Sequence, residues 1–268
     1  MKRKIRKYLE KNIKNLSDSK IIVFGGTGEI GVALIEELVY LNAGVVLFVR
    51  NIDKTNRIIN DLKIKYPNSK IDLVYIDLAS KDFKEVLRLQ SNNINPTHII
   101  INSGANELEE DLSYRINCYN PFNIIKNFKG VKTIVTSSIS YKGRNNNDFY
   151  ACHKRELMQL SYALTNEYDI VFVHPGIVYT NLFYNRNKKY RFIFPILKLF
   201  MPSTYKASLN IVYALNKRIG RNEWIGPKGI FKVFGYPGVS KLKKEVFEVE
   251  NIEKVKKHLE EKERKYGL

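Results

Sequence analysis

Two side chains in this sequence have the types and the spacing of an acid–base pair. Tyr150 and Lys154 stand four residues apart, so on a helix they lie on one face. A tyrosine phenol has a pKa of about 10 and exchanges protons poorly at neutral pH. A neighbouring ammonium favours the phenolate and lowers that pKa. The pair is therefore suited to proton exchange with an alcohol or a carbonyl.

A glycine-rich loop near the N-terminus is typical of a dinucleotide site. The apolar run Ile21–Phe24 ends in glycines at G-x-x-G-x-x-G spacing. Glycine lets the backbone turn tightly and approach a pyrophosphate, and the helix that follows offers free N–H groups to the phosphates. Since a strand pattern precedes the loop and a helical pattern follows it, we predict phosphate contacts from this segment. Its expected cofactor-binding residues are Gly25, Thr27, Gly28, Glu29, Ile30 and Gly31.

The residue that follows the second apolar run bears on the choice of cofactor. Arg50 comes directly after Val45–Val49. An acidic residue at this place would bind a ribose 2′-hydroxyl, whereas an arginine can pair with a 2′-phosphate. We therefore expect NADP(H) to be favoured over NAD(H). The alternative is that Arg50 is a surface residue without a ligand.

Strand and helix patterns alternate along most of the chain. Strands that are apolar on both faces and alternate with helices indicate a parallel sheet covered on both sides. We predict a single-domain α/β fold, a doubly wound parallel sheet (Rossmann fold) of about seven strands. The expected strands are at residues 21–24, 45–49, 71–76, 98–101, 134–135, 170–173 and 230–234.

Composition excludes several classes of protein. The 268 residues are 44% hydrophobic, which excludes intrinsic disorder and collagen-like chains. Two cysteines make no disulfide framework, and four scattered histidines have no metal-ligand spacing. We expect no metal, and the sequence shows neither a transmembrane run nor a signal peptide. A cytoplasmic protein is the expectation.

Together the motifs resemble the short-chain dehydrogenase/reductase superfamily over roughly residues 20–235. Ser138 stands twelve residues before Tyr150, where the family has a serine that hydrogen-bonds the substrate oxygen, and the adjacent Ser137 is the alternative. By the resemblance, Asn117 holds a water that relays protons between Lys154 and solvent. The implied catalytic residues are Tyr150, Lys154, Ser138 and Asn117.

Three further segments resemble the cofactor contacts of that family. Ile101-Asn102-Ser103-Gly104 stands where the family has Asn-Asn-Ala-Gly, with Ile101 and Ser103 in place of the first asparagine and the alanine, and Asp77-Leu78 stands at the adenine contact. Asp77 is alternatively the N-cap of the next helix. Pro175-Gly176-Ile177-Val178-Tyr179-Thr180 resembles the loop that holds the nicotinamide carboxamide. The resemblance adds these cofactor-binding residues: Asp77, Leu78, Asn102, Ser103, Gly104, Tyr150, Lys154, Pro175, Gly176, Val178 and Thr180.

The resemblance implies an NAD(P)(H)-dependent oxidoreductase that transfers a hydride between the nicotinamide and a carbonyl or secondary alcohol. A non-catalytic dinucleotide-sensing module is one alternative. The glycine spacing also resembles the sugar-nucleotide-modifying branch of the superfamily, but the chain has no room for that branch's extra substrate domain. The family usually associates through the helices that carry Asn117 and Tyr150, so a homo-oligomer, a dimer or a tetramer, is expected.

The expected domain organisation follows from these assignments. Residues 1–19 form a basic helix whose apolar face holds Ile5, Leu9, Ile13 and Leu16. Residues 20–236 form the dehydrogenase/reductase domain, and residues 237–268 form a helical tail. A lid at about 181–204, rich in aromatic and aliphatic residues, indicates a bulky apolar substrate or a surface that touches lipid. The alternative is a lid buried against its own core or a dimer partner.

The positive charge is unevenly distributed. The chain has a net charge of +18, and residues 1–20 hold eight basic and two acidic side chains, while residues 181–232 hold eleven and one. This excess favours an anionic substrate or peripheral contact with an anionic membrane. No recognised nucleic-acid-binding motif is present, so nucleic acid is not an expected partner.

Overall fold

A mostly parallel sheet forms the centre of the molecule. The structure, a computed structural model, describes residues 1–106, 109–138, 148–186, 192, 201–229 and 233–266. Within these residues the sheet has eight strands in the order β3-β2-β1-β4-β5-β6-β7-β8, and only β8 runs antiparallel, against β7. The strands are β1 Lys20–Phe24, β2 Gly44–Val49, β3 Ile71–Tyr75, β4 His98–Ile101, β5 Lys132–Thr136, β6 Ile170–Val173, β7 Glu223–Pro227 and β8 Pro237–Lys241.

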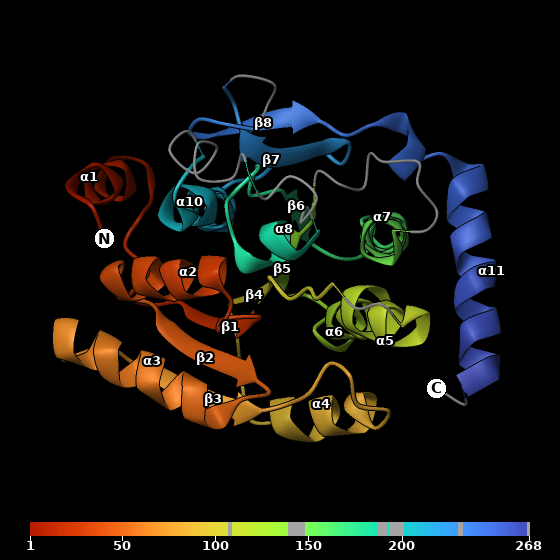
Figure 1. The fold of residues 1–268 in the computed structure, drawn as a ribbon, viewed down its shortest axis with the longest axis horizontal. Helices are drawn as coiled ribbons and strands as arrows, with labels where there is room; N and C mark the ends of the chain where they lie inside the picture. The colour runs from red at the N-terminus through yellow and green to blue at the C-terminus, as the bar shows by residue number, and fades with distance from the viewer. Residues whose placement is uncertain (107–108, 139–147, 187–191, 193–200, 230–232, 267–268) are drawn as a thin grey trace.

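Helices cover both faces of the sheet (Figure 1). One layer packs on one face and comprises α1 Arg3–Asn12, α2 Glu29–Tyr40, α3 Ile52–Lys65 and α10 Thr204–Leu215. The opposite layer comprises α4 Phe83–Ser91, α5 Glu110–Tyr114, α6 Asn120–Asn127, α7 Phe149–Ala163 and α11 Val249–Tyr266. The remaining elements are the π-helix η1 Arg115–Tyr119, the short α8 Asn181–Arg186 and the 3₁₀ turn η5 Lys244–Val246. The predicted doubly wound Rossmann architecture is confirmed.

The apolar strands explain why two helical layers form. Successive side chains of a strand point to opposite faces. In β1, Ile21 and Val23 belong to the core beneath α2 and α10, whereas Ile22 and Phe24 belong to the core beneath α6 and α7. A strand that is apolar on both faces must be covered on both faces, because otherwise one row of side chains would remain in water.

The strand predicted at residues 230–234 falls mostly outside the described part of the chain. The strand at this edge is β7 at Glu223–Pro227, and Val233 and Phe234 lie in a turn, while residues 230–232 fall outside the described part of the chain. Glycine and proline are depleted in strands, which is why the end of β7 reads as a turn. Parallel pairing with β6 and antiparallel pairing with β8 override that local preference.

The segment expected as a helical tail begins with a strand. β8 joins the sheet through register pairs such as Trp224 with Ser240, and α11 follows only from Val249. α11 packs along α7 on the outer face of that layer, and Figure 1 shows it at the edge of the molecule opposite α1.

The basic N-terminal helix is part of the domain. α1 ends at Asn12, and the apolar side chains Ile5, Leu9, Ile13 and Leu16 are all buried in the core on its side of the sheet. Its lysines and arginines are exposed. Among the described residues, no helix combines the length and the apolar character needed to cross a bilayer.

Candidate active site

A cavity of about 910 Å³ lies at the carboxyl ends of the parallel strands. Its lining residues follow β1 through β6 in the sequence, and ligands of open α/β sheets bind at this edge. Every expected cofactor-binding and catalytic residue lines the cavity except Gly31 and Asn117. The structure therefore brings together motif residues that are as much as 155 positions apart in the sequence, from Gly25 to Thr180.

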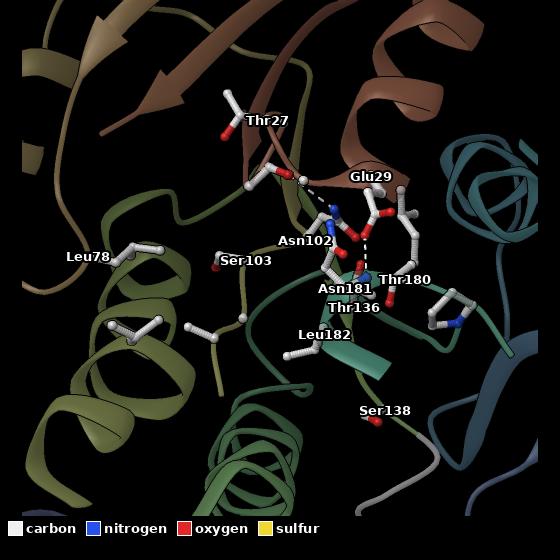
Figure 2. Close-up of a pocket in the computed structure, with 18 of the residues that line it drawn as sticks. Thr27, Glu29, Leu78, Asn102, Ser103, Thr136, Ser138, Thr180, Asn181 and Leu182 are labelled. Carbon is white, nitrogen blue, oxygen red and sulfur yellow. Dashed lines mark hydrogen bonds between the residues drawn. The ribbon is translucent and has the colours of Figure 1, made fainter. Parts of the chain in front are cut away.

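The glycine-rich loop needs its glycines at two places. Gly25 has a φ of +81°, and a Cβ there would lie 2.6 Å from the backbone nitrogen of Ser103. At Gly31 a Cβ would lie 2.3 Å from the carbonyl oxygen of Gly25. Gly31 thus supports the loop from behind, which explains why it does not line the cavity. Asn102 Nδ2 donates to the Gly25 carbonyl at 3.3 Å, and this bond joins the loop to the end of β4 (Figure 2).

Several polar groups in the cavity wall are available to a ligand. Gly28 is the N-cap of α2, and no side chain caps that helix start. Ser103 Oγ and Thr136 Oγ1 are buried and have no hydrogen-bond partner among the described residues. Uncapped helical N–H groups bind phosphates, and buried polar atoms without partners are costly unless a ligand or water satisfies them. The glycine cradle and these groups fit a dinucleotide.

The end of the cavity beside β2 carries two cations. Arg50 and Lys54 are both exposed, and both line the cavity near Phe48 and Val49. Lys54 lies in the first turn of α3, where its backbone N–H donates to the Asn51 side chain at 2.8 Å. Arg50 is predicted from the sequence, whereas Lys54 is not. A basic residue four positions after Arg50, at a helix start, was the available signal.

Asp77 also faces this cavity. Its side chain accepts the N–H of Ala79 at 2.9 Å, and α4 begins only after Asp82. The alternative of an N-cap for the next helix is therefore wrong for Asp77. Leu78 lines the cavity beside it, and its carbonyl accepts a hydrogen bond from Asn120 Nδ2 at 2.9 Å.

Tyr150 and Lys154 lie side by side at the start of α7. Asp148 caps this helix by accepting the N–H of Ala151 at 3.1 Å. A Cβ built on Gly104 would lie 3.2 Å from Lys154 Cε and 3.3 Å from Tyr150 Cε2. Both side chains therefore pack against the backbone that follows β4, as their i, i+4 spacing requires.

The Lys154 ammonium is held within the protein. Its Nζ donates to the Ser103 carbonyl at 2.6 Å and to the Thr136 carbonyl at 3.4 Å. Only 2% of the residue is exposed, and this burial lowers the pKa of Lys154 to about 8. At neutral pH the group is a cation whose position is fixed by two backbone carbonyls.

The two adjacent serines after β5 have different surroundings. Ser137 is buried, and its hydroxyl contacts the sulfur of Met158 in the core. Both serines line the cavity, but only Ser138 is partly exposed there (Figure 2). This placement favours Ser138 over Ser137 as the serine that faces a substrate.

Asn117 lies behind the cavity wall in the π-helix η1. Its Oδ1 accepts the N–H of Ala105 at 3.0 Å, and its Nδ2 donates to the Ala105 carbonyl at 2.8 Å. π turns are rare and occur frequently at functional sites. The side chain thus holds the segment that follows β4, directly behind Tyr150 and Lys154.

One short helix extends from the loop after β6 over the cavity. At the start of α8, the backbone N–H of Asn181 donates to Glu29 Oε2 at 2.6 Å, so that Glu29 joins the glycine loop to this helix (Figure 2). Leu182 and Phe183 of α8 line the cavity. Residues 187–191 and 193–200 of the expected lid lie outside the described part of the chain.

No protein-family model and no curated protein matches this chain. Solved structures do match. An uncharacterised protein from Mycobacterium paratuberculosis gives a TM-score of 0.67 at 13% identity, over 96% of each chain. A short-chain dehydrogenase/reductase from Mycobacterium ulcerans gives a TM-score of 0.61 at 16% identity, over 75% of this chain and 84% of that one. This chain has the short-chain dehydrogenase/reductase fold. L-sorbose reductase from Gluconobacter frateurii, complexed with NADPH and L-sorbose, gives a TM-score of 0.61 at 16% identity, over 75% of this chain and 90% of that one.

Within this short-chain dehydrogenase/reductase fold, two side chains that act through others were not predicted from the sequence. Asp148 caps the helix that carries Tyr150, and Ser113 hydrogen-bonds Asn117 at 3.2 Å. Asp148 could have been found as an N-cap residue directly before a helical pattern. Ser113 precedes Asn117 by four residues, a spacing that places both on one helical face, but nothing local indicates that they bond.

Proposed function

We propose that the chain is an NADP(H)-dependent oxidoreductase of the short-chain dehydrogenase/reductase superfamily. It would reduce a carbonyl or oxidise a secondary alcohol. The observation that carries this proposal is that Tyr150 and the buried Lys154 line the same cavity as an uncapped glycine-rich helix start. A dinucleotide-sensing module has no need of a proton-transferring pair at this place.

The expected cofactor contacts divide along the cavity. The loop from Gly25 to Ile30 would hold the pyrophosphate, Arg50 and Asp77 the adenosine end, and the segment Pro175–Thr180 the nicotinamide. Asn102, Ser103 and Gly104 would form the wall behind the cofactor. When bound, the nicotinamide supplies or accepts a hydride.

The chain's own residues would handle the proton and orient the substrate. In the reductive direction the Tyr150 hydroxyl donates its proton to the substrate oxygen, and the Lys154 ammonium stabilises the phenolate that forms. The Ser138 hydroxyl hydrogen-bonds the same substrate oxygen. Asn117 fixes the backbone at Ala105 and, by the family resemblance, supports a water that returns a proton toward Lys154.

Cofactor binding and turnover test this proposal together. NADPH is titrated into the purified protein, and its consumption is then followed with a panel of ketones and aldehydes that includes bulky apolar, anionic and sugar-nucleotide substrates. We expect tight binding and turnover of at least one carbonyl compound. Tight binding with no turnover across the panel would instead support the sensing module. Turnover confined to sugar nucleotides would support that branch of the superfamily.

The two cations near β2 carry the preference for NADP(H). A charge-assisted bond to the 2′-phosphate is worth about 1.5–3 kcal/mol. Arg50→Asp is therefore expected to raise the NADPH Kd roughly 10- to 100-fold and the NADH Kd far less, and Lys54→Met is expected to act in the same direction. The control is Arg57→Met, because Arg57 lies on α3, as Lys54 does, but outside the cavity lining. If NADPH preference is absent in the wild type or survives Arg50→Asp, this assignment is wrong.

The substrate we propose is bulky and apolar, or anionic. Leu182, Phe183 and Ile116 give the described cavity part of its apolar lining. Residues 181–232, whose first three members line the cavity, hold eleven basic side chains and one acidic side chain. An apolar body with an anionic group satisfies both features.

We also propose a cytoplasmic protein that makes peripheral contact with anionic membranes through α1. The apolar face of this helix is occupied by the core, so any attraction is electrostatic, at about 1 kcal/mol for each lysine or arginine near the surface. We expect co-sedimentation with vesicles that contain acidic lipid at low salt, with loss at high salt. Replacing Lys4, Lys7 and Lys11 with glutamate should abolish it, while the same change on α11 at Lys254, Lys256 and Lys257 should not. Binding that is insensitive to salt would count against the idea.

A homo-oligomer remains our proposal, with α11 at its interface. α11 covers the outer face of α7 and is fixed there by His258 Nδ1 against Glu156 Oε2 at 3.2 Å and by Lys262 Nζ against Glu110 Oε1 at 2.8 Å. A dimer or tetramer formed on this side of the molecule must therefore bury α11. Light scattering should give a multiple of the 31.2 kDa chain mass, and a monomer at micromolar concentration would contradict this proposal.

A further inference from the structure

We propose that Ser113 and His153 are positioning residues for the reaction, because they hold Asn117 and, through it, the backbone on which Tyr150 and Lys154 pack. This proposal rests on the proposed function. Ser113 lies on α5, His153 lies on α7 between the two catalytic side chains, and both are buried. Neither of them lines the cavity.

The hydrogen bonds of Asn117 define the direction of this link. Its Oδ1 accepts from the Ala105 N–H, so its Nδ2 supplies only donors. One donor goes to the Ala105 carbonyl at 2.8 Å, and the other goes to Ser113 Oγ at 3.2 Å. Asn117 is fully buried, so these bonds are not exchanged for bonds to bulk water.

Ser113 passes the link on to His153. Its oxygen accepts from Asn117, its own hydrogen can be donated, and His153 Nδ1 lies 3.0 Å away. We therefore infer that His153 is neutral, with Nδ1 as the acceptor and the proton on Nε2. The chain of bonds then runs from Asn117 to Ser113 to His153 without a conflict between donors.

The surroundings of His153 keep the ring in this state and orientation. Phe149 stacks on the imidazole with ring centroids 6.1 Å apart, and Tyr114 meets it edge-on at 5.3 Å. Burial lowers the pKa of His153. The charged and titratable groups that face it are Glu110 from α5, Glu156 from α7, and His258 and Lys262 from α11.

A displacement of Asn117 would reach the catalytic pair directly. Ala105 follows Gly104, and a Cβ built on Gly104 would lie 3.2 Å from Lys154 Cε and 3.4 Å from Asn117 Oδ1. One residue earlier, the Ser103 carbonyl accepts from Lys154 Nζ at 2.6 Å. Because a misplacement of about 1 Å can cost about 100-fold in rate, a loose segment here would slow proton transfer without removing a reacting group.

The kinetic test uses variants that remove or restore one bond. Ser113→Ala and His153→Leu are each expected to lower kcat about tenfold, while the KM for NADPH stays within about twofold. The double variant should be no slower than either single variant, because both changes interrupt the same chain of hydrogen bonds to Asn117. His153→Asn should recover most of the rate, since its amide oxygen can replace Nδ1 as the acceptor. Ser161→Ala, which removes a buried hydroxyl on α7 that takes no part in this chain of bonds, should have no effect.

A second measurement does not depend on turnover. The Ala105 amide donates to Asn117, so its hydrogen exchange should accelerate at least about tenfold in Ser113→Ala and His153→Leu, but not in His153→Asn or Ser161→Ala. Unchanged Ala105 protection in Ser113→Ala would overturn the proposal, as would a His153→Asn variant as slow as His153→Leu. If the wild type has no turnover, the proposed function fails while the exchange result still decides this link.

Discussion

Replacing Tyr150 with phenylalanine is expected to lower kcat about 10³-fold while the NADPH Kd stays within about twofold. The change removes only the hydroxyl that transfers the proton. The residue is 8% exposed, and its ring, which packs against the backbone at Gly104, remains in place. A loss confined to kcat separates proton transfer from cofactor binding.

Steady-state kinetics and cofactor titration on the same preparations measure this effect. Tyr162→Phe is the matched control, because Tyr162 lies on the same helix and donates its hydroxyl to Asn222 Oδ1 at 2.7 Å, outside the cavity lining. It should leave turnover unchanged. Equal turnover in Tyr150→Phe and the wild type would contradict the proposed mechanism.

Replacing Lys154 with methionine is expected to impair both proton transfer and cofactor binding. Because the ammonium stabilises the Tyr150 phenolate and lies in the cofactor cavity, we expect kcat to fall about 10³-fold and the NADPH Kd to rise about tenfold. Lys132→Met is the control. Burial also lowers the pKa of Lys132, and its Nζ donates to the Leu215 and Lys217 carbonyls. A Lys154→Met variant with wild-type kcat would remove the lysine from the mechanism.

The lowered pKa of Lys154 also predicts the shape of the pH profile. With a pKa of about 8 in the folded protein, the side chain is an ammonium below pH 8 and neutral above it. Reduction requires the ammonium, so kcat/KM for reduction should decline as pH rises above about 8. A profile that is flat to about pH 10 would contradict this assignment.

The fold could be predicted where the local pattern and the tertiary structure agree. The apolar runs of β1, β2, β4, β5 and β6 are rich in valine and isoleucine and lie in the interior of a covered sheet, so composition alone indicates them. β7 and β8 could not be placed, because Gly226, Pro227, Pro237 and Gly238 oppose strand formation locally. Only pairing between distant segments makes them strands.

In the candidate site too, residues within local motifs could be predicted, whereas residues that matter through tertiary contacts could not. Its motifs sit directly after strands, so the resemblance gave residues that the parallel sheet then gathers around one cavity. Lys54, Ser113 and His153 were missed. Their relevance depends on which residues of other elements they meet, as in the contact of Ser113 on α5 with His153 on α7.

Transfer of a deuterium label from the cofactor tests the central claim most directly. NADPH that carries deuterium at C4 of the nicotinamide is incubated with the protein and a carbonyl compound from the panel, and the alcohol product is examined by mass spectrometry. We predict one deuterium on the carbinol carbon in the wild type and none above background in Tyr150→Phe over the same time. Product without the label, or tight NADPH binding with no labelled product from any carbonyl compound, would contradict hydride transfer at this site.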